Sequence, residues 1–253
     1  MNIDFSGKRV LVTGGTRGIG RCIVEHFLEA GAQVAVNGST PESTAQALAE
    51  LGAGDQALAA PGSVWSVAGC RAVVDAALAG LGGLDVLVNN AGTDTESSVE
   101  NIDEEIWDRI VDTNLKGAFF TTQRALPALQ ASHGSIINMS SVLGLVGAVD
   151  ESIYCATKAG IIALTRAHAL EFAPHVRVNA VCPGVIDTDM LRKWAVYMTG
   201  SVEAGYDILG AENAFGRVAH VREIAGPVLY LASDLASFVT GSIHVVDGGM
   251  IAD

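Results

Sequence analysis

The 253-residue sequence contains few basic residues, few cysteines and no long apolar run, and each shortage argues against a class of protein. Fifteen lysines and arginines stand against 28 acidic residues, which gives a net charge of −13. Nucleic-acid binding needs a basic face, so this charge argues against it. No stretch reaches the roughly 18 apolar residues that a membrane-spanning helix requires. The opening residues also lack the basic start and apolar core of a secretory signal.

Cysteine and histidine are too sparse for a disulfide framework or a metal centre. The four cysteines, Cys22, Cys70, Cys155 and Cys182, are widely separated and form no Cys-x-x-Cys pair. They are typical of buried free thiols in a reducing cytoplasm, which is where we expect the protein. The six histidines form no cluster at ligand spacing, so we expect no catalytic metal.

The sequence does contain a regular alternation of apolar strand-like runs and helical segments. We expect strands at residues 10–12, 34–36, 58–60, 86–88, 136–138, 176–181 and 243–246. A helix is expected at Pro41–Leu51, with proline in its first turn and Gly52 past its end. Continuous apolar runs between helices indicate a parallel sheet covered on both faces. The chain length suits one α/β domain with ligands at the carboxyl ends of its strands.

A glycine cluster lies between the first expected strand and the first expected helix. Gly14, Gly18 and Gly20 have the spacing Gly-x3-Gly-x-Gly, and Gly31 ends the helical pattern. Glycines allow the backbone to approach a pyrophosphate, and the helix N-terminus offers free N–H groups to it. An ordinary strand-to-helix turn would also use glycine, so the cluster alone favours a dinucleotide only moderately.

Tyr154 and Lys158 are four residues apart, which places them on one face of a helix. A free tyrosine has a pKa of about 10, and lowering it to about 7 takes about 4 kcal/mol, which a nearby cation in a partly dry site can supply. The phenol would then exchange a proton with an alcohol or carbonyl oxygen, and Ser141 would hydrogen-bond the same oxygen. Because Tyr-x-x-x-Lys is common by chance, this hypothesis depends on the rest of the chain.

Further motifs follow in order: Asn89-Asn90-Ala91-Gly92, Asn114, Pro183-Gly184 with Thr188, and Asp247-Gly248-Gly249. With the motifs above, the chain resembles the short-chain dehydrogenase/reductase family, in its branch of about 250 residues that includes members like 3-oxoacyl-carrier-protein reductase. The resemblance implies a single doubly wound Rossmann domain over residues 1–253, with a substrate lid at about 190–215. It also implies an NAD(P)(H)-dependent oxidoreductase that interconverts a carbonyl and a secondary alcohol.

The resemblance assigns roles to individual residues. Tyr154 would be the acid or base, Lys158 would lower its pKa and hold the nicotinamide ribose, and Ser141 would orient the substrate oxygen. Asn114 would interrupt a helix and position a proton-relaying water. Together with Tyr154 and Lys158, the expected cofactor-binding residues are Gly14, Thr16, Arg17, Gly18, Ile19, Gly20, Ser39, Thr40, Ser63, Val64, Asn90, Ala91, Gly92, Pro183, Gly184, Ile186 and Thr188.

Two positions depart from the family pattern and bear on the cofactor. NAD-specific members carry an acid at the end of the second strand, where this chain has Asn37-Gly38-Ser39-Thr40. The missing carboxylate permits a 2′-phosphate, and Arg17 would add a positive partner, so NADP(H) is preferred and NAD(H) remains possible. Ser63 stands where the family has an aspartate that meets the adenine, which predicts a weaker contact.

The substrate is expected to be a largely apolar ketone or alcohol. An apolar wall beside Tyr154 and Lys158 would be formed by Val142, Leu143, Leu145, Val146 and Val149. The lid could add apolar side chains that face the substrate, or these could pack within the lid itself: Leu191, Trp194, Tyr197 and Met198. Asp150 and Glu151 would disfavour a strongly anionic substrate if they point inward, but they are expected to be solvated.

The resemblance implies that carrier-protein reductases of this family use basic residues to bind their acidic carrier, some of them just before the strand that leads to the serine. Residues 130–135 contain no lysine or arginine. A 3-oxoacyl-carrier-protein reductase is therefore an alternative and not the first choice.

Two further expectations concern the kind of protein and its assembly. A non-catalytic dinucleotide-sensing or scaffold protein is an alternative of another class, since a fold does not fix a function. The helix that bears Tyr154 has small residues at Ala156, Ala159, Gly160, Ala163 and Ala167. They would pair helices in a homotetramer or else pack on the sheet.

Overall fold

The computed structural model describes residues 3–95 and 97–252, and within them seven parallel strands form one sheet of order β3-β2-β1-β4-β5-β6-β7. The strands are β1 Arg9–Val12, β2 Gln33–Val36, β3 Ala57–Ala59, β4 Val86–Asn89, β5 Ser135–Met139, β6 Arg177–Pro183 and β7 Ile243–Val246. Every expected strand is therefore present, within a few residues at its ends. The strand order confirms the doubly wound Rossmann class.

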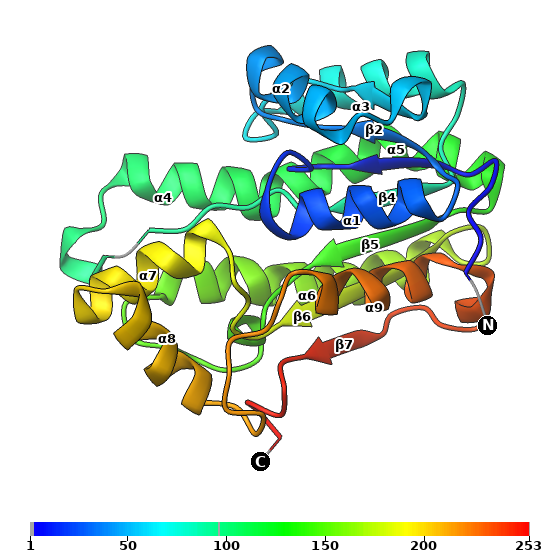
Figure 1. The fold of residues 1–253 in the computed structure, drawn as a ribbon. Helices are drawn as coiled ribbons and strands as arrows, with labels where there is room; N and C mark the ends of the chain where they lie inside the picture. Colours follow the sequence, from blue (N-terminus) through cyan, green and yellow to red (C-terminus); the bar gives the residue numbers. More distant parts are fainter. Residues whose placement is uncertain (1–2, 96, 253) are drawn as a thin grey trace.

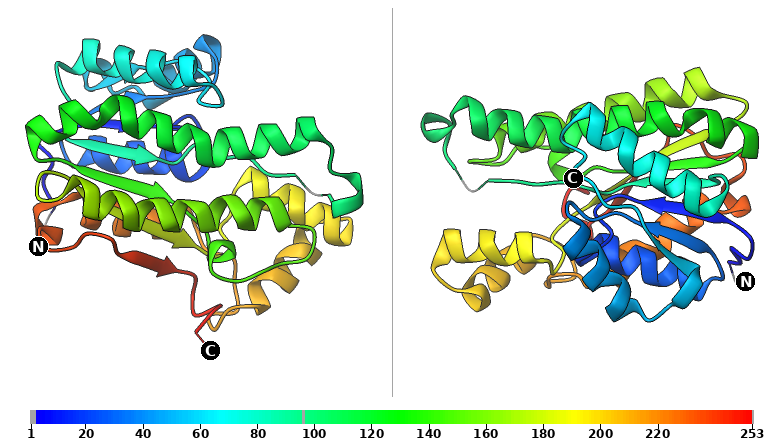
Figure 2. Two further views of the ribbon diagram at one scale, coloured as in Figure 1. Left: turned by 180° about the vertical axis from the view of Figure 1, so that it is seen from behind. Right: turned by 90° about the horizontal axis from the view of Figure 1, so that it is seen from above.

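Helices cover both faces of the sheet (Figure 1 and Figure 2). On one face α1 (Gly18–Glu29) and α9 (Arg222–Ala232) pack through buried residues such as Phe27 and Ile224. On the other face α3 (Val67–Leu81), α5 (Gly117–Ser132) and α6 (Ser152–Phe172) pack through residues such as Val73 and Leu129. β1, β4 and β5 lie between the two layers, which explains the apolar runs 10–12, 86–88 and 136–137 within them.

Of the remaining helices, α2 packs on the same face as α1 through Leu48 and Leu51, and α4, α7 and α8 lie beyond the carboxyl ends of the strands (Figure 1). α2 is Pro41–Leu51, α4 is Glu104–Val111, α7 is Asp189–Thr199 and α8 is Val202–Ala211, and shorter helical turns occupy Gly54–Gln56, Val99–Asn101, Asp112–Lys116, Val142–Gly144 and Asp234–Ala236. The α2 bounds agree with the sequence expectation because Thr40 caps its start and Gly52, at φ +60°, ends it. In the described part of the chain, no helix has the length and apolar character needed to span a membrane.

Helices α7 and α8 stand beyond the carboxyl ends of the strands, on the same side as α4 (Figure 1). They have a small hydrophobic cluster of their own, in which Ala195 and Leu209 pack with Val185. Two chain segments join them to the rest of the fold: residues 184–188 lead from β6 to α7, and residues 212–221, the returning segment, lead from α8 to α9. These two segments pair with each other. The Asp187 N–H donates to the carbonyl of Ala219 at 2.8 Å, and the Ala219 N–H donates to Val185 at 3.0 Å.

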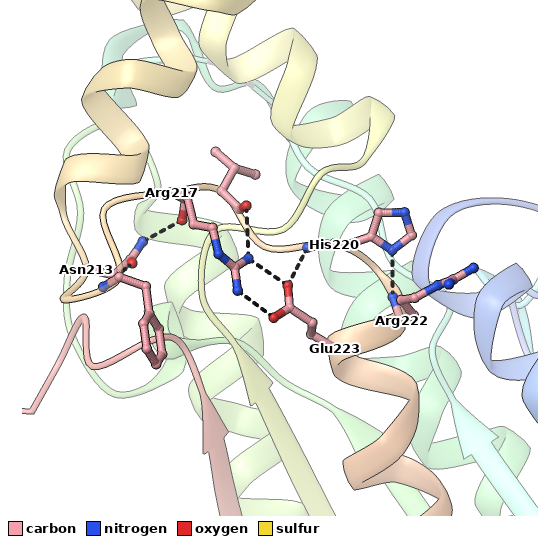
Figure 3. Close-up of polar contacts among 7 residues, drawn as sticks. Asn213, Arg217, His220, Arg222 and Glu223 are labelled. Atoms are coloured by element: carbon pink, nitrogen blue, oxygen red, sulfur yellow. Dashed lines mark hydrogen bonds and ion pairs between the residues drawn. The ribbon is translucent and has the colours of Figure 1, made fainter.

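The returning segment is also fixed to α9 by charged and polar contacts (Figure 3). Both terminal nitrogens of Arg217 donate to the Glu223 carboxylate, at 2.7 and 2.8 Å. The same carboxylate accepts from the backbone N–H of His220 at 2.8 Å. Asn213 donates to the Arg217 carbonyl at 2.9 Å. The helical pair α7–α8 is therefore held at a defined place relative to the sheet.

Candidate active site

The loop between β1 and α1 has a backbone conformation that requires glycine. Gly14 and Gly18 have φ of +62° and +55°, in the left-handed region. A Cβ on Gly14 would lie 2.9 Å from the Cα of Ala91, and one on Gly20 would overlap the Gly14 carbonyl and the Asn90 amide. Arg17 is the N-cap of α1 and its side chain makes no capping bond. The first N–H groups of α1 therefore face the loop as an anion site.

The motif after β4 holds this glycine loop in place. Thr13 Oγ1 accepts hydrogen bonds from the N–H groups of Asn90 and Ala91, at 2.9 and 3.1 Å. The Asn90 amide in turn donates to the carbonyl of Gly14 at 3.0 Å. The Asn90 side chain, expected to line the adenosine and ribose region, is thus committed to the loop itself.

Asn37, at the end of β2, is a positioning residue that the sequence did not single out. Its side chain is buried, and Oδ1 accepts from the Gly14 N–H at 3.2 Å. Its Nδ2 donates to the carbonyls of Ala60 and Gly62, at 2.8 and 2.9 Å. Asn37, next to the place expected for the 2′-group of the cofactor, therefore turns inward and joins the loops after β1, β2 and β3. Its place after a buried strand was the available signal.

The other expected adenosine-side residues differ in exposure. Arg17, Ser39 and Thr40 are exposed, and Ser63 is half-buried beside buried Val64. The Thr40 hydroxyl caps α2, since it accepts from the Ser43 N–H at 3.1 Å. Thr16 lies next to Gly38, where a Cβ would come within 2.7 Å of its methyl group. Ser39 and Arg17 consequently remain the more available partners for a 2′-phosphate.

Ser141, Tyr154 and Lys158 meet at the carboxyl end of β5. Lys158 is buried, and its Nζ donates to the carbonyl of Met139 at 2.9 Å. The same nitrogen lies 5.3 Å from the centroid of the Tyr154 ring. The Ser141 hydroxyl hydrogen-bonds the Tyr154 side chain. The neighbouring Ser140 instead donates to the Lys158 carbonyl at 2.8 Å, so it holds α6 in place and does not face the substrate oxygen.

The electrostatics of this group differ from the expectation for Tyr154. Burial raises the pKa of the Tyr154 phenol above its ordinary value, and the carboxylates of Asp94 and Glu151 raise it further. The expected fall in this pKa is therefore wrong for the protein alone, because Lys158 bonds to Met139 and does not outweigh burial and the two acids. Burial also lowers the pKa of Lys158 to about 8, and Asp94 opposes this fall.

Asn114 interrupts the helical stretch between α4 and α5, as expected. It lies in a π-helical turn, Asp112–Lys116, and is buried. Its amide exchanges two hydrogen bonds with the backbone of Thr93, both at 2.8 Å, and donates to Thr157 Oγ1 at 3.3 Å. Asn114 therefore fixes the segment after Gly92 against α6. The relayed water expected here stays a prediction.

The segment after β6 closes the site opposite the glycine loop. A Cβ on Gly184, which follows Pro183, would lie 2.9 Å from the Cα of Asp247, so the C-terminal motif packs directly behind it. Ile186 is buried, and Thr188 caps α7 by accepting from the Leu191 N–H at 3.2 Å. A Cβ on Gly18 would lie 3.7 Å from the Thr188 methyl group. The glycine loop and the segment after β6 thus lie side by side.

The residues fit a dinucleotide at this edge of the sheet. The glycine loop leaves no room for a side chain, and the first turn of α1 is uncapped. Gly92 keeps space beside the reactive group, because a Cβ there would lie 3.6 Å from the Lys158 ammonium. Among the described residues, no cluster of three or more His, Cys, Asp or Glu side chains could hold a metal ion.

Acidic residues also approach Tyr154, one of them against expectation. Glu151 is 5% exposed, so the expectation that it is solvated is wrong: the first turn of α6 carries it inward. Asp150 is half-buried and accepts a hydrogen bond from the Tyr197 hydroxyl of α7 at 3.3 Å. Asp94, which sequence reasoning missed, follows Gly92 and Thr93 on the segment that Asn114 fixes. Its position two residues after a motif glycine could have marked it.

Comparison with known proteins identifies the family. A family model described as enoyl-(acyl carrier protein) reductase matches residues 14–251. The 3-oxoacyl-[acyl-carrier-protein] reductase FabG of Staphylococcus aureus is 39% identical over 247 residues, which are 96% of this chain and 98% of the relative. A solved short-chain dehydrogenase/reductase of Brucella melitensis, titled a glucose/ribitol dehydrogenase, is 32% identical with a TM-score of 0.91 over 99% of both chains. The chain belongs to the short-chain dehydrogenase/reductase family.

A second solved structure extends the comparison to a sugar dehydrogenase. The aldohexose dehydrogenase of Thermoplasma acidophilum is 34% identical, with a TM-score of 0.90 over 99% of this chain and 96% of that one. As a family member, the chain is an NAD(P)(H)-dependent oxidoreductase that interconverts a carbonyl and a secondary alcohol on a small molecule. This outcome goes against the alternative of a non-catalytic sensor or scaffold.

Proposed function

We propose that the chain reduces a free small-molecule ketone, or oxidises the matching secondary alcohol, with Tyr154 as the acid or base. The observation that carries this proposal is the meeting of Ser141, Tyr154 and Lys158 beside Gly92 at the carboxyl edge of the sheet. A nicotinamide bound there supplies or accepts the hydride. In reduction the Tyr154 hydroxyl gives its proton to the carbonyl oxygen, while Ser141 donates a hydrogen bond to that oxygen.

The raised pKa of Tyr154 suits the acid role, because the phenol keeps its proton at neutral pH. In oxidation the phenol must first lose that proton, and a positively charged neighbour favours this step. Lys158 is the cation next to the ring. Asn114 holds Thr93, and through it the segment that faces Lys158 and Tyr154.

Replacing Tyr154 with phenylalanine tests the proposal. Only the hydroxyl is removed, so the fold and the affinity for the cofactor should be kept while kcat falls about 10²–10⁴-fold. Turnover is measured by cofactor absorbance over a set of ketones and alcohols, and affinity by titration of cofactor fluorescence. A variant that keeps near-full turnover on any substrate of the parent would exclude Tyr154 as the proton donor.

For the cofactor we propose a preference for NADP(H), with NAD(H) usable. The support is that Asn37 turns inward and no carboxylate takes its place, while exposed Ser39 and Arg17 can bind a 2′-phosphate. Arg17→Ala should lower kcat/KM for NADPH about tenfold and leave that for NADH nearly unchanged. A parent that prefers NADH, or a variant with an unchanged ratio of the two, would contradict this assignment.

For the remaining features we propose that α7 and α8 form the substrate lid and that the chain assembles as a homotetramer. Large apolar side chains are exposed on these helices, including Val196, Met198 and Ile208, as a substrate-covering surface requires.

A cytoplasmic location is supported by the four cysteines, all of them free thiols.

The second candidate is a 3-oxoacyl-carrier-protein reductase, favoured by the 39% identity to FabG of Staphylococcus aureus. A carrier-linked substrate would require the chain to bind an acidic carrier protein through basic residues. The end of α5 and its following turn, residues 130–135, present no lysine or arginine for such a partner. We therefore place the free small molecule first. Comparing the turnover of a carrier-linked 3-oxoacyl substrate with that of its free ester tests this ranking. Faster turnover of the carrier-linked form would place the carrier-protein reductase first.

A further inference from the structure

Two asparagines interrupt the apolar face of the sheet on which α5 and α6 pack. Leu87 of β4 and Ile136 of β5 are paired on this face, and the next pair toward the carboxyl edge is Asn89 and Asn138. Side chains two residues apart in a strand lie on the same face, so both amides lie between the sheet and the helices. They are only 6% and 3% exposed. Burying an amide costs free energy unless it is hydrogen-bonded, so its partners matter.

The two amides connect α5 to α6 through buried hydrogen bonds. Asn89 Nδ2 donates to Thr122 Oγ1 of α5 at 3.0 Å and to Asn138 Oδ1 at 2.9 Å. Asn138 Nδ2 then donates to Thr165 Oγ1 of α6 at 2.9 Å. The Thr165 hydroxyl donates its own proton to the carbonyl of Ile161 at 2.8 Å, so its oxygen serves Asn138 as an acceptor.

Three consecutive residues, at the end of β5 and just after it, each hydrogen-bond to α6. Asn138 donates to Thr165. The Met139 carbonyl accepts from Lys158 Nζ at 2.9 Å, and the Ser140 hydroxyl donates to the Lys158 carbonyl at 2.8 Å. Thr165 lies two helical turns after Lys158, which is about 10 Å along the helix axis. β5 therefore holds α6 at two separate places.

The second place of attachment fixes what the first leaves free. A helix held only at Lys158 could turn or slide on the sheet and keep its apolar contacts, because hydrophobic packing has no preferred direction. Hydrogen bonds are short and directional, so the bond between Asn138 and Thr165 removes this freedom. Tyr154 and Lys158 lie in the first two turns of α6, and a shift of α6 would move both relative to Ser141.

We infer that Asn138 and Thr165 are positioning residues for the proton transfer: their hydrogen bond fixes α6 along β5 and thereby holds Lys158 and Tyr154 in place. Asn89 supports this bond, because it donates to the Asn138 amide and so sets its orientation. The inference rests on the proposed function of Tyr154. It adds two residues that act on the reaction through α6.

Thr165→Val tests the inference, because valine keeps the shape of the side chain and removes the acceptor. We expect kcat to fall about tenfold or more, since small misplacements of reacting groups are costly. The cofactor Kd, measured by fluorescence titration, should change less than about threefold, because the glycine loop is not touched. Thr165→Ser keeps the hydroxyl and should restore kcat to nearly the parent value.

Two further variants distinguish positioning from stability. Asn138→Leu removes the other partner of the bond, and combining it with Thr165→Val should lower kcat little further, because one interaction is lost once. Ser135→Ala is the control: Ser135 is buried at the opposite end of β5, where its hydroxyl donates to the Ala232 carbonyl at 3.3 Å. It should leave kcat at the parent value.

A second measurement follows Lys158 directly, without cofactor or substrate. The sequence contains only four lysines, Lys8, Lys116, Lys158 and Lys193, so NMR of protein labelled with ¹³C-lysine resolves each of them. Burial lowers the pKa of Lys158 to about 8, against the opposing charge of Asp94. In Thr165→Val this pKa should rise toward the ordinary value of about 10.4 as α6 loosens. In Ser135→Ala it should stay near the parent value.

The outcomes separate the inference from the proposed function. Thr165→Val with the kcat and the Lys158 titration of the parent would overturn the inference and leave the role of Tyr154 intact, as would an equal loss of kcat in Ser135→Ala. If neither Thr165→Val nor Asn138→Leu folds, the bond serves stability and the inference is wrong. A parent without turnover on any ketone or alcohol, with the cofactor bound, would overturn the proposed function, and the Lys158 titration would still test the placement of α6.

Discussion

At the scale of single residues, the site is governed by which charges reach the Tyr154 hydroxyl. Burial raises the pKa of this phenol most, Asp94 and Glu151 raise it further, and the hydrogen bond to Ser141 lowers it. Burial lowers the pKa of Lys158, beside the ring, to about 8. Since the phenol and the ammonium interact, they should titrate as a pair with shared apparent values.

This arrangement predicts the pH dependence of the two reaction directions. Oxidation needs the phenolate, and the pKa of Tyr154 is raised above the ordinary tyrosine value of about 10, so kcat/KM for oxidation should still be rising at that pH. Reduction uses the protonated phenol and should therefore not fall through loss of this proton below about pH 10. Asp94→Asn removes a charge that disfavours the phenolate, so it should move the rising limb to lower pH. The pH profiles of parent and variant check this, with Asp108→Asn, on the exposed side of α4, as control. A limb that stays in place in Asp94→Asn would show that Asp94 does not act on the phenol.

At the scale of elements, the strands and the glycine loop could be predicted because local sequence dictates them. Buried parallel strands need unbroken apolar runs, and helix bounds such as those of α2 follow from capping residues. The inward position of Asn37 and the burial of Glu151 could not be predicted in the same way. Asn37 turns inward because three loops offer it partners. Glu151 is buried because α6 packs as it does, although its type and position suggest a solvated residue.

The glycine loop allows a matched test of local packing. In Gly20→Ala the new Cβ would overlap the Gly14 carbonyl and the Asn90 amide, so the loop must shift. We expect a loss of about 1–3 kcal/mol in the free energy of unfolding and at least tenfold weaker cofactor binding.

Gly226→Ala is the control, because nothing lies within 4 Å of a Cβ built at that position in α9. This second substitution should stabilise by up to about 1 kcal/mol through helix propensity. Chemical denaturation and cofactor titration measure both effects. Equal behaviour of the two variants would mean that the loop tolerates a side chain.

At the scale of the whole molecule, one face of α6 is left uncovered within a single chain. Ala156, Ala159, Ala163 and Ala167 are exposed, as is Leu170 at 83%. The alternative that these alanines pack on the sheet is therefore wrong. Their small side chains would let a second α6 approach closely, and the proposed tetramer uses them in this way.

Light scattering at micromolar concentration tests the assembly. The parent should have the mass of four chains, and Ala163→Arg should shift the protein to a smaller species because a long charged side chain prevents close approach of the helices. Ala45→Arg, on the exposed face of α2, should keep the parent mass. A parent that runs as a monomer would contradict the proposal.

The pairing of the two segments that lead to and from α7 and α8 has an evolutionary consequence. The hydrogen bonds between Ala219 and both Val185 and Asp187 close the chain into a stem, beyond which α7 and α8 pack on their own small cluster. Because this stem is closed by backbone hydrogen bonds, mutations and insertions beyond it need not change the register of β6. Selection can therefore alter which molecules enter the site while the proton-transfer chemistry is inherited unchanged.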